Sequence, residues 1–249
     1  MNSSIDMETV RTELASSGKL RVGVVFAPEV STFFVSTDEA SNPYGPTVDL
    51  GKALAESLGV QAEFSLVPNS GELTDAVENE TIDVAFMPMD EERKQRVAFG
   101  PSYFVIESTG LVHADSAFQV ASDLNQAGVR VAGIANTTTI RNAERVLPAA
   151  TIVSVASVAD AMEALRSGKA DAVALSRDVL LVYQAKVDGT RIVDGTLHST
   201  GIAIAVSRNR PVALRFASLF LEEAKANGLV RQAFDKAGLV KDLVAPVGT

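Results

Sequence analysis

The sequence predicts an α/β fold made of two similar lobes, and three observations support this. Short apolar runs alternate with segments of helical apolar spacing, as in a parallel sheet with helices on both faces. The alternation starts near residue 20 and starts again near residue 129. The stretches AVENETIDVAFMP and ALRSGKADAVALS align without a gap, placing Asp83 opposite Asp171 and Pro88 opposite Ser176. We therefore expect Pro88 and Ser176 at corresponding strand ends.

The composition is ordinary for a globular protein and argues against several classes of function. Of 249 residues, 47% are hydrophobic and 21% are charged, which is enough apolar material for a sizeable core. The formal charge is −9, so the chain has no excess of basic residues, and we expect neither a nucleic-acid partner nor binding to an anionic membrane. No apolar run approaches the length of a bilayer span. The absence of cysteine removes disulfides and thiol nucleophiles.

The first 18 residues are polar and acidic, and they lack the basic-then-apolar order of a secretory signal. Either the chain is cytoplasmic, or a signal was removed before the numbering begins. The residues alone leave both interpretations open.

Apolar spacing and turn residues predict the elements of the first half. Gly59 is expected to stop a helix whose apolar face carries Leu50, Leu54 and Leu58, and Asn69 or Ser70 is expected to cap the next helix. The expected elements are a helix over residues 6–16, a strand over 20–26, a long loop over 27–46, a helix ending at Gly59, a strand over 62–67, a helix over 72–79 and a strand over 83–86.

The second half repeats this order and then adds a closing set of elements. The expected elements are strands over residues 129–134, 152–155, 172–175 and 201–206, helices over 140–146, 158–165, 211–226 and 229–237, and a packed loop after Gly238.

Arg93 is the most informative residue of the segment 83–103. The strand before it reaches Pro88, whose missing N–H is expected to stop the ladder, and Asp90 with the next two glutamates opens a helix. A cation in that first turn is unfavourable, so on this segment alone a surface ion pair with Glu91 or Glu92 is the simpler interpretation. The alternative is a guanidinium held at the carboxyl end of a strand, donating its planar fork to a ligand carboxylate.

A series of short motifs occurs in a fixed order between Lys19 and Gly238. They are KLRVGV over residues 19–24, GPTVDL over 45–50, LGV over 58–60, ER over 92–93 with Phe99 and Tyr103, NTT over 136–138, GKADA over 168–172, GIA over 201–203 and NG over 227–228. In this order they resemble the bacterial extracellular solute-binding proteins of family 3, which have the type II periplasmic binding fold and serve polar amino-acid ABC transporters.

The resemblance implies two lobes, each a mainly parallel sheet flanked by helices, joined by two hinge strands. Lobe 1 would comprise residues 1–103 and 201–249, lobe 2 residues 108–195, and the hinges residues 103–107 and 196–200. It implies a binding protein and not an enzyme, with ligand trapped as the lobes close. We expect a periplasmic monomer whose signal was removed, a membrane permease as partner, no nucleic acid, no membrane insertion, no cofactor and no metal.

The resemblance also implies which residues bind the ligand. Arg93 would clamp a carboxylate, and Thr137, Thr138 and Thr139 would add donors at a helix N-terminus, although ordinary N-capping explains the threonines equally well. Phe33 and Phe34 are either core residues, the simpler interpretation, or a stacking wall. The other expected lining residues are Asn69, Ser70, Met87, Pro88, Asp90 and Ser176.

Three departures from the family pattern bear on the ligand. Ser176 stands where the family has a carboxylate that pairs with the ligand ammonium, and Pro88 stands where a hydroxyl residue with an N–H is usual. Ile134 replaces a polar residue that the family often has beside the turn at Thr137. An unpaired buried ammonium is costly. The hypothesis is therefore a carboxylate ligand whose amino group is absent, modified or held by another group. The acids that could replace the missing one are Asp178, Glu29 and Asp90.

Other functions on the same fold remain open at this point. A cleft enzyme resembling cyclohexadienyl dehydratase would use Glu107 or Asp178 as its acid, yet neither lies in a specific catalytic motif. A metal enzyme is less favoured, because His113 and His198 have no ligand-like spacing around them. A ligand-sensing module for a separate receptor is the third possibility.

Overall fold

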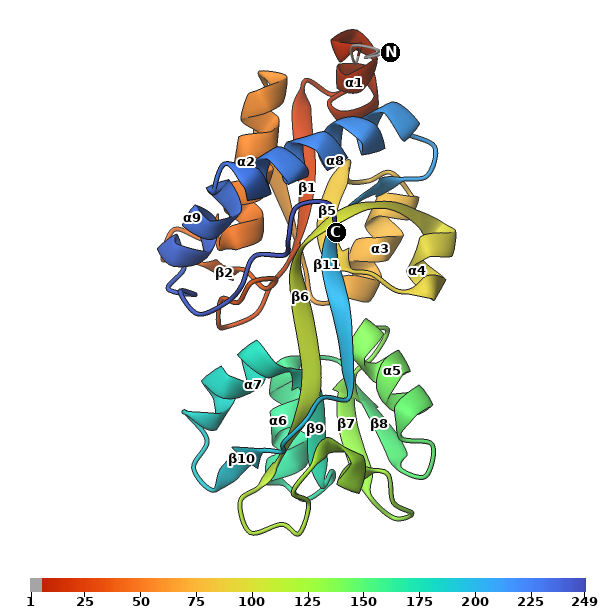
Figure 1. The fold of residues 1–249 in the computed structure, drawn as a ribbon, viewed down its shortest axis with the longest axis vertical. Coiled ribbons are helices and arrows are strands. Elements are labelled where there is room, and N and C mark those ends of the chain that lie inside the picture. Colours follow the sequence, from red (N-terminus) through yellow and green to blue (C-terminus); the bar gives the residue numbers. More distant parts are fainter. Residues whose placement is uncertain (1–5) are drawn as a thin grey trace. The chain divides into compact units, whose positions relative to one another are not determined.

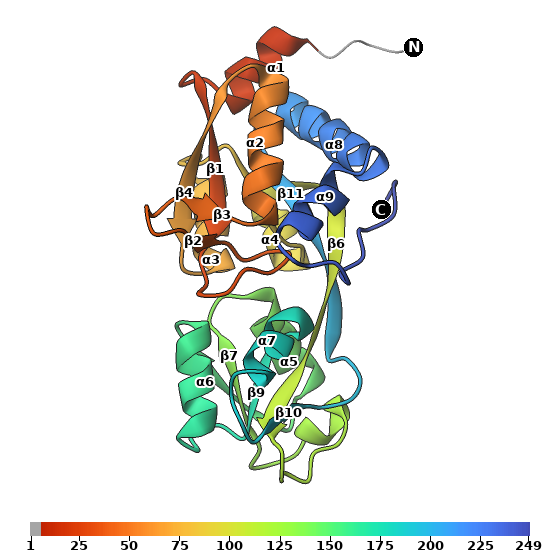
Figure 2. The same cartoon turned by 90° about the vertical axis from the view of Figure 1, so that its left-hand side faces the viewer.

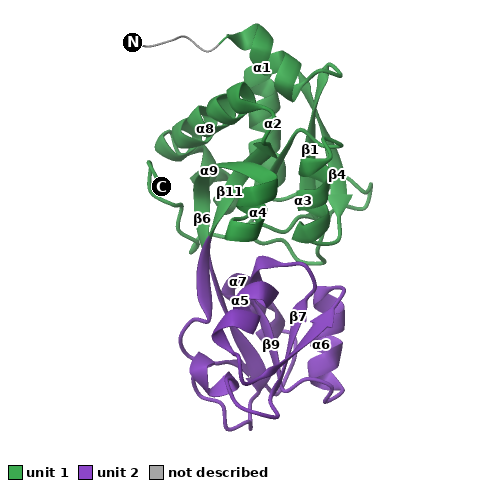
Figure 3. Cartoon of the chain, turned by 90° about the vertical axis from the view of Figure 1, so that its right-hand side faces the viewer, with its two compact units in different colours: residues 1–105, 201–249 green, residues 106–200 purple. Residues whose placement is uncertain are grey.

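The computed structural model describes residues 6–249, so residues 1–5 of the predicted first lobe lie outside the described part. The chain forms two compact units (Figure 3). Unit 1 comprises residues up to 105 together with 201–249, and unit 2 comprises residues 106–200. The chain leaves unit 1 within strand β6 (Val97–His113) and returns within strand β11 (His198–Ser207). A hinge at these two crossings stays a prediction.

Unit 1 is built on a mixed sheet with the strand order β4-β1-β5-β11, of which β1, β5 and β11 are labelled in Figure 1. Strand β1 (Lys19–Val25) pairs in parallel with β4 (Gln61–Val67) and with β5 (Val84–Pro88). Strand β11 is antiparallel to β5, so the sheet is mainly parallel, as expected, with one antiparallel neighbour. Between β5 and β11 the chain passes through unit 2, so these two strands are not joined by the helical crossover that connects parallel neighbours.

Two helices cover opposite faces of this sheet (Figure 2). The chain steps from β1 to β4 through α2 (Pro46–Leu58), and back past β1 to β5 through α3 (Ser70–Glu78), so right-handed crossovers place these helices on opposite sides. Gly51 of α2 packs against Val22, and Gly23, which points the other way, lies under Leu73 of α3. The remaining helices are α1 (Met7–Leu14), α4 (Glu91–Arg96), α8 (Pro211–Ala226) and α9 (Leu229–Lys236).

The predicted long loop over residues 27–46 contains a small ribbon. Strands β2 (Ser36–Thr37) and β3 (Pro43–Tyr44) pair antiparallel within it. Strands of two residues are too short for an alternating pattern to reveal, which is why the sequence indicated only a loop.

The C-terminal tail is a packed loop, as predicted, and it lies against the unit 1 part of β6. Backbone bonds join Ser102 N to Thr249 O at 3.1 Å and Ala245 N to Tyr103 O at 2.8 Å. The buried ammonium of Lys225 donates to the carbonyls of Ser102 at 3.1 Å and Pro246 at 2.8 Å, and pairs with Glu222 at 2.9 Å. These contacts hold the tail in unit 1.

Unit 2 has the strand order β10-β6-β9-β7-β8. Three elements were missed from the sequence, namely α7, β10 and the 3₁₀ turn η1. Helix α7 starts directly after β9, so no loop residue separates their apolar patterns. The elements are β7 (Arg130–Ile134), β8 (Thr151–Val155), β9 (Ala172–Ser176), β10 (Thr190–Ile192), η1 (Ala121–Leu124), α5 (Thr138–Val146), α6 (Val158–Arg166) and α7 (Arg177–Gln184).

No helix over residues 6–249 is both long and apolar enough to cross a membrane.

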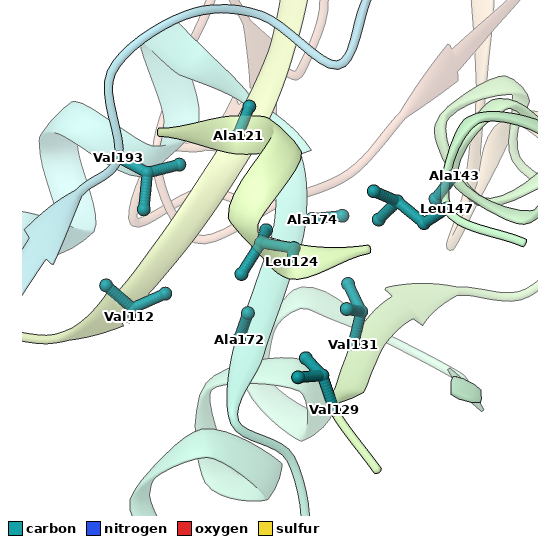
Figure 4. Packing of buried hydrophobic residues seen from close by; sticks show 10 residues of the cluster. All are labelled: Val112, Ala121, Leu124, Val129, Val131, Ala143, Leu147, Ala172, Ala174 and Val193. Atoms are coloured by element: carbon teal, nitrogen blue, oxygen red, sulfur yellow. The ribbon is translucent and has the colours of Figure 1, made fainter. Parts of the chain in front are cut away.

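One face of the unit 2 sheet carries a compact apolar core beneath α5 and η1 (Figure 4). Gly110 of β6 allows the close approach of η1, because a Cβ at this position would lie 2.7 Å from Leu124 Cδ1. The core residues are Val112, Ala121, Leu124, Val129, Val131, Ala143, Leu147, Ala172, Ala174 and Val193. This packing fixes α5 against β9.

The two units repeat one topology. The order β4-β1-β5-β11 of unit 1 corresponds to β8-β7-β9-β6 of unit 2, with the fourth strand antiparallel in both. Strands β5 and β9 each have five residues, and their last residues, Pro88 and Ser176, lie opposite Ile202 and Ser108. The predicted equivalence of Pro88 and Ser176 is therefore confirmed.

An arginine–aspartate clamp joins the first and third strands of each unit. Asp83 Oδ2 accepts from Arg21 N at 2.9 Å and Nε at 3.0 Å, and Oδ1 accepts from Nη2 at 2.6 Å. Asp171 Oδ2 accepts from Arg130 N at 2.8 Å and Nε at 3.1 Å, and Oδ1 accepts from Nη2 at 2.7 Å. The same three bonds in both units confirm that Asp83 and Asp171 correspond.

The two clamps differ in burial. The Asp83 side chain is 1% exposed and also accepts from Arg210 Nη1 at 2.7 Å, whereas the Asp171 side chain is 33% exposed and pairs with Arg130. The hydrogen bond from the Arg130 side chain lowers the pKa of Asp171 below its ordinary value, because it favours the charged form.

We expect the two clamps to respond differently to the same substitution. Asp83→Asn should destabilise unit 1 by about 3 kcal/mol, because two guanidinium groups lose a buried carboxylate. Asp171→Asn should destabilise unit 2 by about 1 kcal/mol, because this pair is partly exposed to solvent. Native-state hydrogen exchange of β5 and β9 amides measures both effects, and equal losses would contradict the difference.

The cost of Asp171→Asn should also depend on pH. The folded pKa of Asp171 is lowered, so its contribution is fully present above its unfolded pKa of about 3.9 and is lost as the pH falls through the folded value. The deficit of the variant should be constant near neutral pH and shrink below about pH 4. Acid titration of the free energy of unfolding tests this, and a deficit that persists in acid would contradict it.

Candidate functional site

Arg93 is buried in unit 1, with 2% of its surface exposed. Asp90 caps helix α4 as predicted, its Oδ1 accepting from Arg93 N at 2.8 Å. Burial overturns the simpler interpretation of a surface ion pair with Glu91 or Glu92. A side chain that enters the protein from the first turn of a short helix is held by tertiary contacts, which the local charge pattern does not show.

The Arg93 guanidinium lies against two other predicted site residues. Nη1 donates to Pro88 O at 2.8 Å, and Nη2 donates to Ser70 Oγ at 2.7 Å. Ser70 is the first residue of α3 and Pro88 the last residue of β5, so three elements converge on one cation. Bonds from both terminal nitrogens fix the plane of the guanidinium at the carboxyl end of β5, where open α/β sheets bind ligands.

Pro88 does not stop the ladder as expected. Pairing with β11 includes Pro88 opposite Ile202, and Met89 N donates to Gly201 O at 2.9 Å beyond it. The N–H and C=O of one strand residue lie on the same side of the strand, and the Pro88 carbonyl lies on the side of Arg93, because it accepts from Arg93 Nη1. The missing N–H therefore faces away from β11 and costs no ladder bond.

The two adjacent aromatic rings have different environments. Phe33 is 4% exposed and belongs to the core, whereas Phe34 is only half-buried. Their ring centroids are 5.0 Å apart, and Ser31 Oγ accepts from the backbone N–H of both residues, at 3.1 Å and 3.0 Å. The core interpretation fits Phe33, and the stacking role remains a prediction for Phe34.

Asn69 and Met87 have structural roles in unit 1. Asn69 is the N-cap of α3, its Oδ1 accepting from Gly71 N at 2.9 Å and Glu72 N at 3.0 Å. Met87 is fully buried, and its sulfur lies 3.5 Å from Thr74 Oγ1. Capping and packing account for these contacts, and ligand contacts by either residue stay a prediction.

In unit 2, Thr137 is the N-cap of α5. Its Oγ1 donates to Ile134 O at 2.7 Å and accepts from Ile140 N at 3.3 Å. Thr138 is 1% exposed, and Thr139 is half-buried. The capping interpretation holds for Thr137, and ligand contacts by Thr137, Thr138 and Thr139 stay a prediction.

Thr139 belongs to a hydroxyl cluster with Ser108 and Ser176. Thr139 Oγ1 lies 3.3 Å from Ser108 Oγ, and Ser108 lies directly opposite Ser176 across strands β6 and β9. Ser108 is 2% and Ser176 6% exposed, and Ser176 makes no side-chain capping bond to α7. The sequence analysis missed Ser108, because only strand pairing brings it beside Ser176.

The acid and histidine candidates of unit 2 lie in other surroundings. Glu107 Oε2 lies 3.4 Å from both Arg177 Nε and Thr196 Oγ1, and neighbouring strand residues point to opposite faces, so Glu107 faces away from Ser108. His113 Nε2 lies 3.1 Å from Leu165 O. Over residues 6–249, no group of three or more histidine, aspartate or glutamate side chains gathers as a metal site would require.

One surface hollow of unit 1 is unrelated to these residues. It is lined by Lys19, Lys52, Glu56 and Phe64 among others. Lys19 is the first residue of β1, so the hollow lies near the amino ends of the parallel strands. Arg93 and Ser70 lie at the other end of these strands, the carboxyl end, and we place the candidate site there.

Substituting Ser70 should reveal how firmly it holds Arg93. Ser70→Ala is expected to lower the free energy of unfolding by about 2 kcal/mol, because a buried charged donor loses its acceptor. The control is Ser57→Ala on α2, where an exposed hydroxyl donates only to Leu54 O at 2.7 Å and the change should stay within about 0.5 kcal/mol. Urea unfolding measures both, and equal effects would rule out the anchoring role.

Comparisons of the sequence with known proteins give a family and relatives. The model of the bacterial extracellular solute-binding proteins, family 3, matches residues 22–238. The glutamine-binding protein of Geobacillus stearothermophilus is 30% identical over 196 residues, which cover 74% of this chain and 71% of that protein.

Solved structures share the fold over most of the chain. A mutant of ArgBP from T. maritima superposes with a TM-score of 0.79 at 31% identity, covering 92% of this chain and 99% of that chain. An ancestral amino acid-binding protein, a precursor of cyclohexadienyl dehydratase, superposes with a TM-score of 0.76 at 29% identity, covering 90% of this chain and 97% of that chain.

Proposed function

The chain belongs to the bacterial extracellular solute-binding proteins, family 3, and from that premise we propose that it is the substrate-binding component of an ABC transporter for a small carboxylate or amino-acid-like solute. The predicted type II periplasmic binding fold is confirmed. Relatives named for glutamine binding and for amino acid binding support this class of solute.

The observation that carries the proposal is the buried guanidinium of Arg93. A fully buried cation is rare without a functional or structural reason, and this one lies at the carboxyl end of β5 with its plane fixed by Ser70 and Pro88. A preoriented guanidinium recognises a carboxylate by two parallel hydrogen bonds. Arg93 is therefore our proposed carboxylate clamp.

The proposed mechanism is capture without chemistry. In unit 1, Arg93, held by Ser70 and the Pro88 carbonyl, would bind the carboxylate of the solute. A solute with greater affinity for one conformation of the protein would shift its conformational equilibrium toward that conformation. The loaded protein would then deliver the solute to a membrane permease outside the cytoplasm, which accords with the extracellular description of the family.

The first experiment asks what the protein carries and whether Arg93 holds it. Native mass spectrometry of the purified protein identifies the bound small acid, and calorimetry measures its affinity. Arg93→Lys keeps the charge but loses the planar fork, so we expect affinity to fall by about 10- to 100-fold.

The matched control is Arg96→Lys on the same helix, where the guanidinium pairs with Asp75 at 2.6 Å and with Glu78. This variant should bind as tightly as the wild-type protein. A folded Arg93→Lys protein that keeps wild-type affinity, with folding checked by thermal unfolding, would reject the proposed function.

A further inference from the structure

We propose that Thr74 is a positioning residue of the candidate site, because its hydroxyl contacts both segments that orient the Arg93 guanidinium. Thr74 lies on α3 and is fully buried. It would act on the solute through Arg93, by keeping the plane of the guanidinium fixed. The inference rests on the proposed function, because it explains how the carboxylate clamp keeps its orientation.

The contacts of Thr74 close a ring around the guanidinium. Arg93 Nη2 donates to Ser70 Oγ at 2.7 Å, and the carbonyl of Ser70 accepts from Thr74 Oγ1 at 2.8 Å. The same Oγ1 lies 3.5 Å from the sulfur of Met87. Met87 precedes Pro88, whose carbonyl accepts from Arg93 Nη1 at 2.8 Å. Both bonds of the guanidinium therefore lead back to one hydroxyl.

The hydroxyl of Thr74 stabilises the start of α3. A hydroxyl has one O–H to donate, and a thioether is a weak acceptor, so the proton goes to the Ser70 carbonyl and Met87 packs against the oxygen. Ser70 is the first residue of the helix, where the backbone frays most easily. The bond from Thr74 limits this motion and thereby holds the Ser70 hydroxyl against Arg93.

Helix propensity and packing do not explain a threonine at this position. Threonine is a weak helix former, and a buried hydroxyl is costly unless it is bonded. The buried face of α3 is otherwise apolar beyond its first residue, with Leu73 and Val77 beside Thr74. Helix α3 packs against both β5 and α4 (Figure 1), so this face is the one that meets the elements carrying the site.

Unit 2 provides an internal comparison, because the same positions there are apolar. Helices α3 and α6 each have nine residues and a side-chain N-cap, and β5 and β9 each have five residues. Extending the alignment of the two repeats over these elements pairs Ser70 with Val158, Thr74 with Met162 and Met87 with Leu175. The hydroxyls of unit 1 are thus absent from the corresponding positions of unit 2.

Unit 2 also has no arginine at the position of Arg93. Arg93 follows Pro88 by five residues, and the residue five positions after Ser176 is Leu181, an exposed side chain. The polar residues of α3 therefore occur in the unit that has a buried guanidinium to orient. This correlation within one chain is what a positioning role for Thr74 predicts.

The test measures the motion of the guanidinium itself. NMR of arginine-labelled protein gives the rate of rotation about the Cζ–Nε bond, and the Arg93 signals are identified by their loss in Arg93→Lys. Thr74→Val removes the hydroxyl at nearly constant volume and should raise the Arg93 rate by about 3- to 10-fold. Thr74→Ser keeps the hydroxyl and should restore the wild-type rate.

Two controls separate positioning from a general loss of stability. Val77→Ala removes buried apolar volume from the same helix, so it should lower the unfolding midpoint and leave the Arg93 rate unchanged. Thr12→Val removes an equivalent bond on α1, where Oγ1 donates to Glu8 O at 3.0 Å, and should change neither. An Arg93 rate that rises equally in Thr74→Val and Val77→Ala overturns the inference.

The consequence for binding is tested by calorimetry with L-glutamate and succinate as carboxylate probes. Thr74→Val should weaken each probe that binds the wild-type protein by about 3- to 10-fold, and should have no further effect in an Arg93→Lys background. Equal losses in both backgrounds would mean that Thr74 acts independently of Arg93, which overturns the inference. If neither probe binds, the rotation rate decides by itself.

The outcomes separate this inference from the proposed function. An unchanged Arg93 rate in Thr74→Val rejects the positioning role and leaves the carboxylate clamp intact. If Thr74→Val does not fold, Thr74→Ala decides with the same measurement. If Arg93→Lys binds like the wild-type protein, the proposed function is rejected whatever the Thr74 variants show.

Discussion

The arginine–aspartate clamp between the first and third strands is the constraint on which each unit depends. A single carboxylate accepts one backbone and two side-chain N–H groups, so it fixes both the register of the strands and the direction of the arginine. Both third strands then run for five residues and end at Pro88 and Ser176. The clamp therefore lies at one end of each sheet, and Pro88 and Ser176 lie at the other.

The two units share one topology but carry different polar groups at equivalent strand ends. At the end of β5, a buried guanidinium bonds the Pro88 carbonyl and the Ser70 hydroxyl. At the equivalent end of β9, Ser176 faces Ser108 beside Thr139, and no cation takes the place of Arg93 in this cluster. The carboxyl end of β5 therefore offers a fixed positive charge, which is why we propose a solute with a carboxylate, and the equivalent end of β9 offers neutral hydroxyls.

The repeat itself was visible before the structure, and the details of the site were not. Aligning two thirteen-residue stretches sufficed to match Asp83 with Asp171, because a buried acid before an apolar strand is a local pattern. Asp90, Asn69 and Thr137 were identified as helix-start residues for the same reason. Burial of Arg93 was not predicted, since its charge pattern alone suits a surface.

The sequence by itself determined the class of fold, the repetition of its elements and the presence of a cation at the end of β5, because periodicity, capping and turn residues act over a few neighbouring positions. Only the tertiary structure decided that Arg93 meets Ser70, 23 residues away, that Ser108 meets Thr139, 31 residues away, and that β11 is antiparallel to β5. These features depend on which distant segments pack together, and hydrophobic burial drives that packing without leaving a local signature.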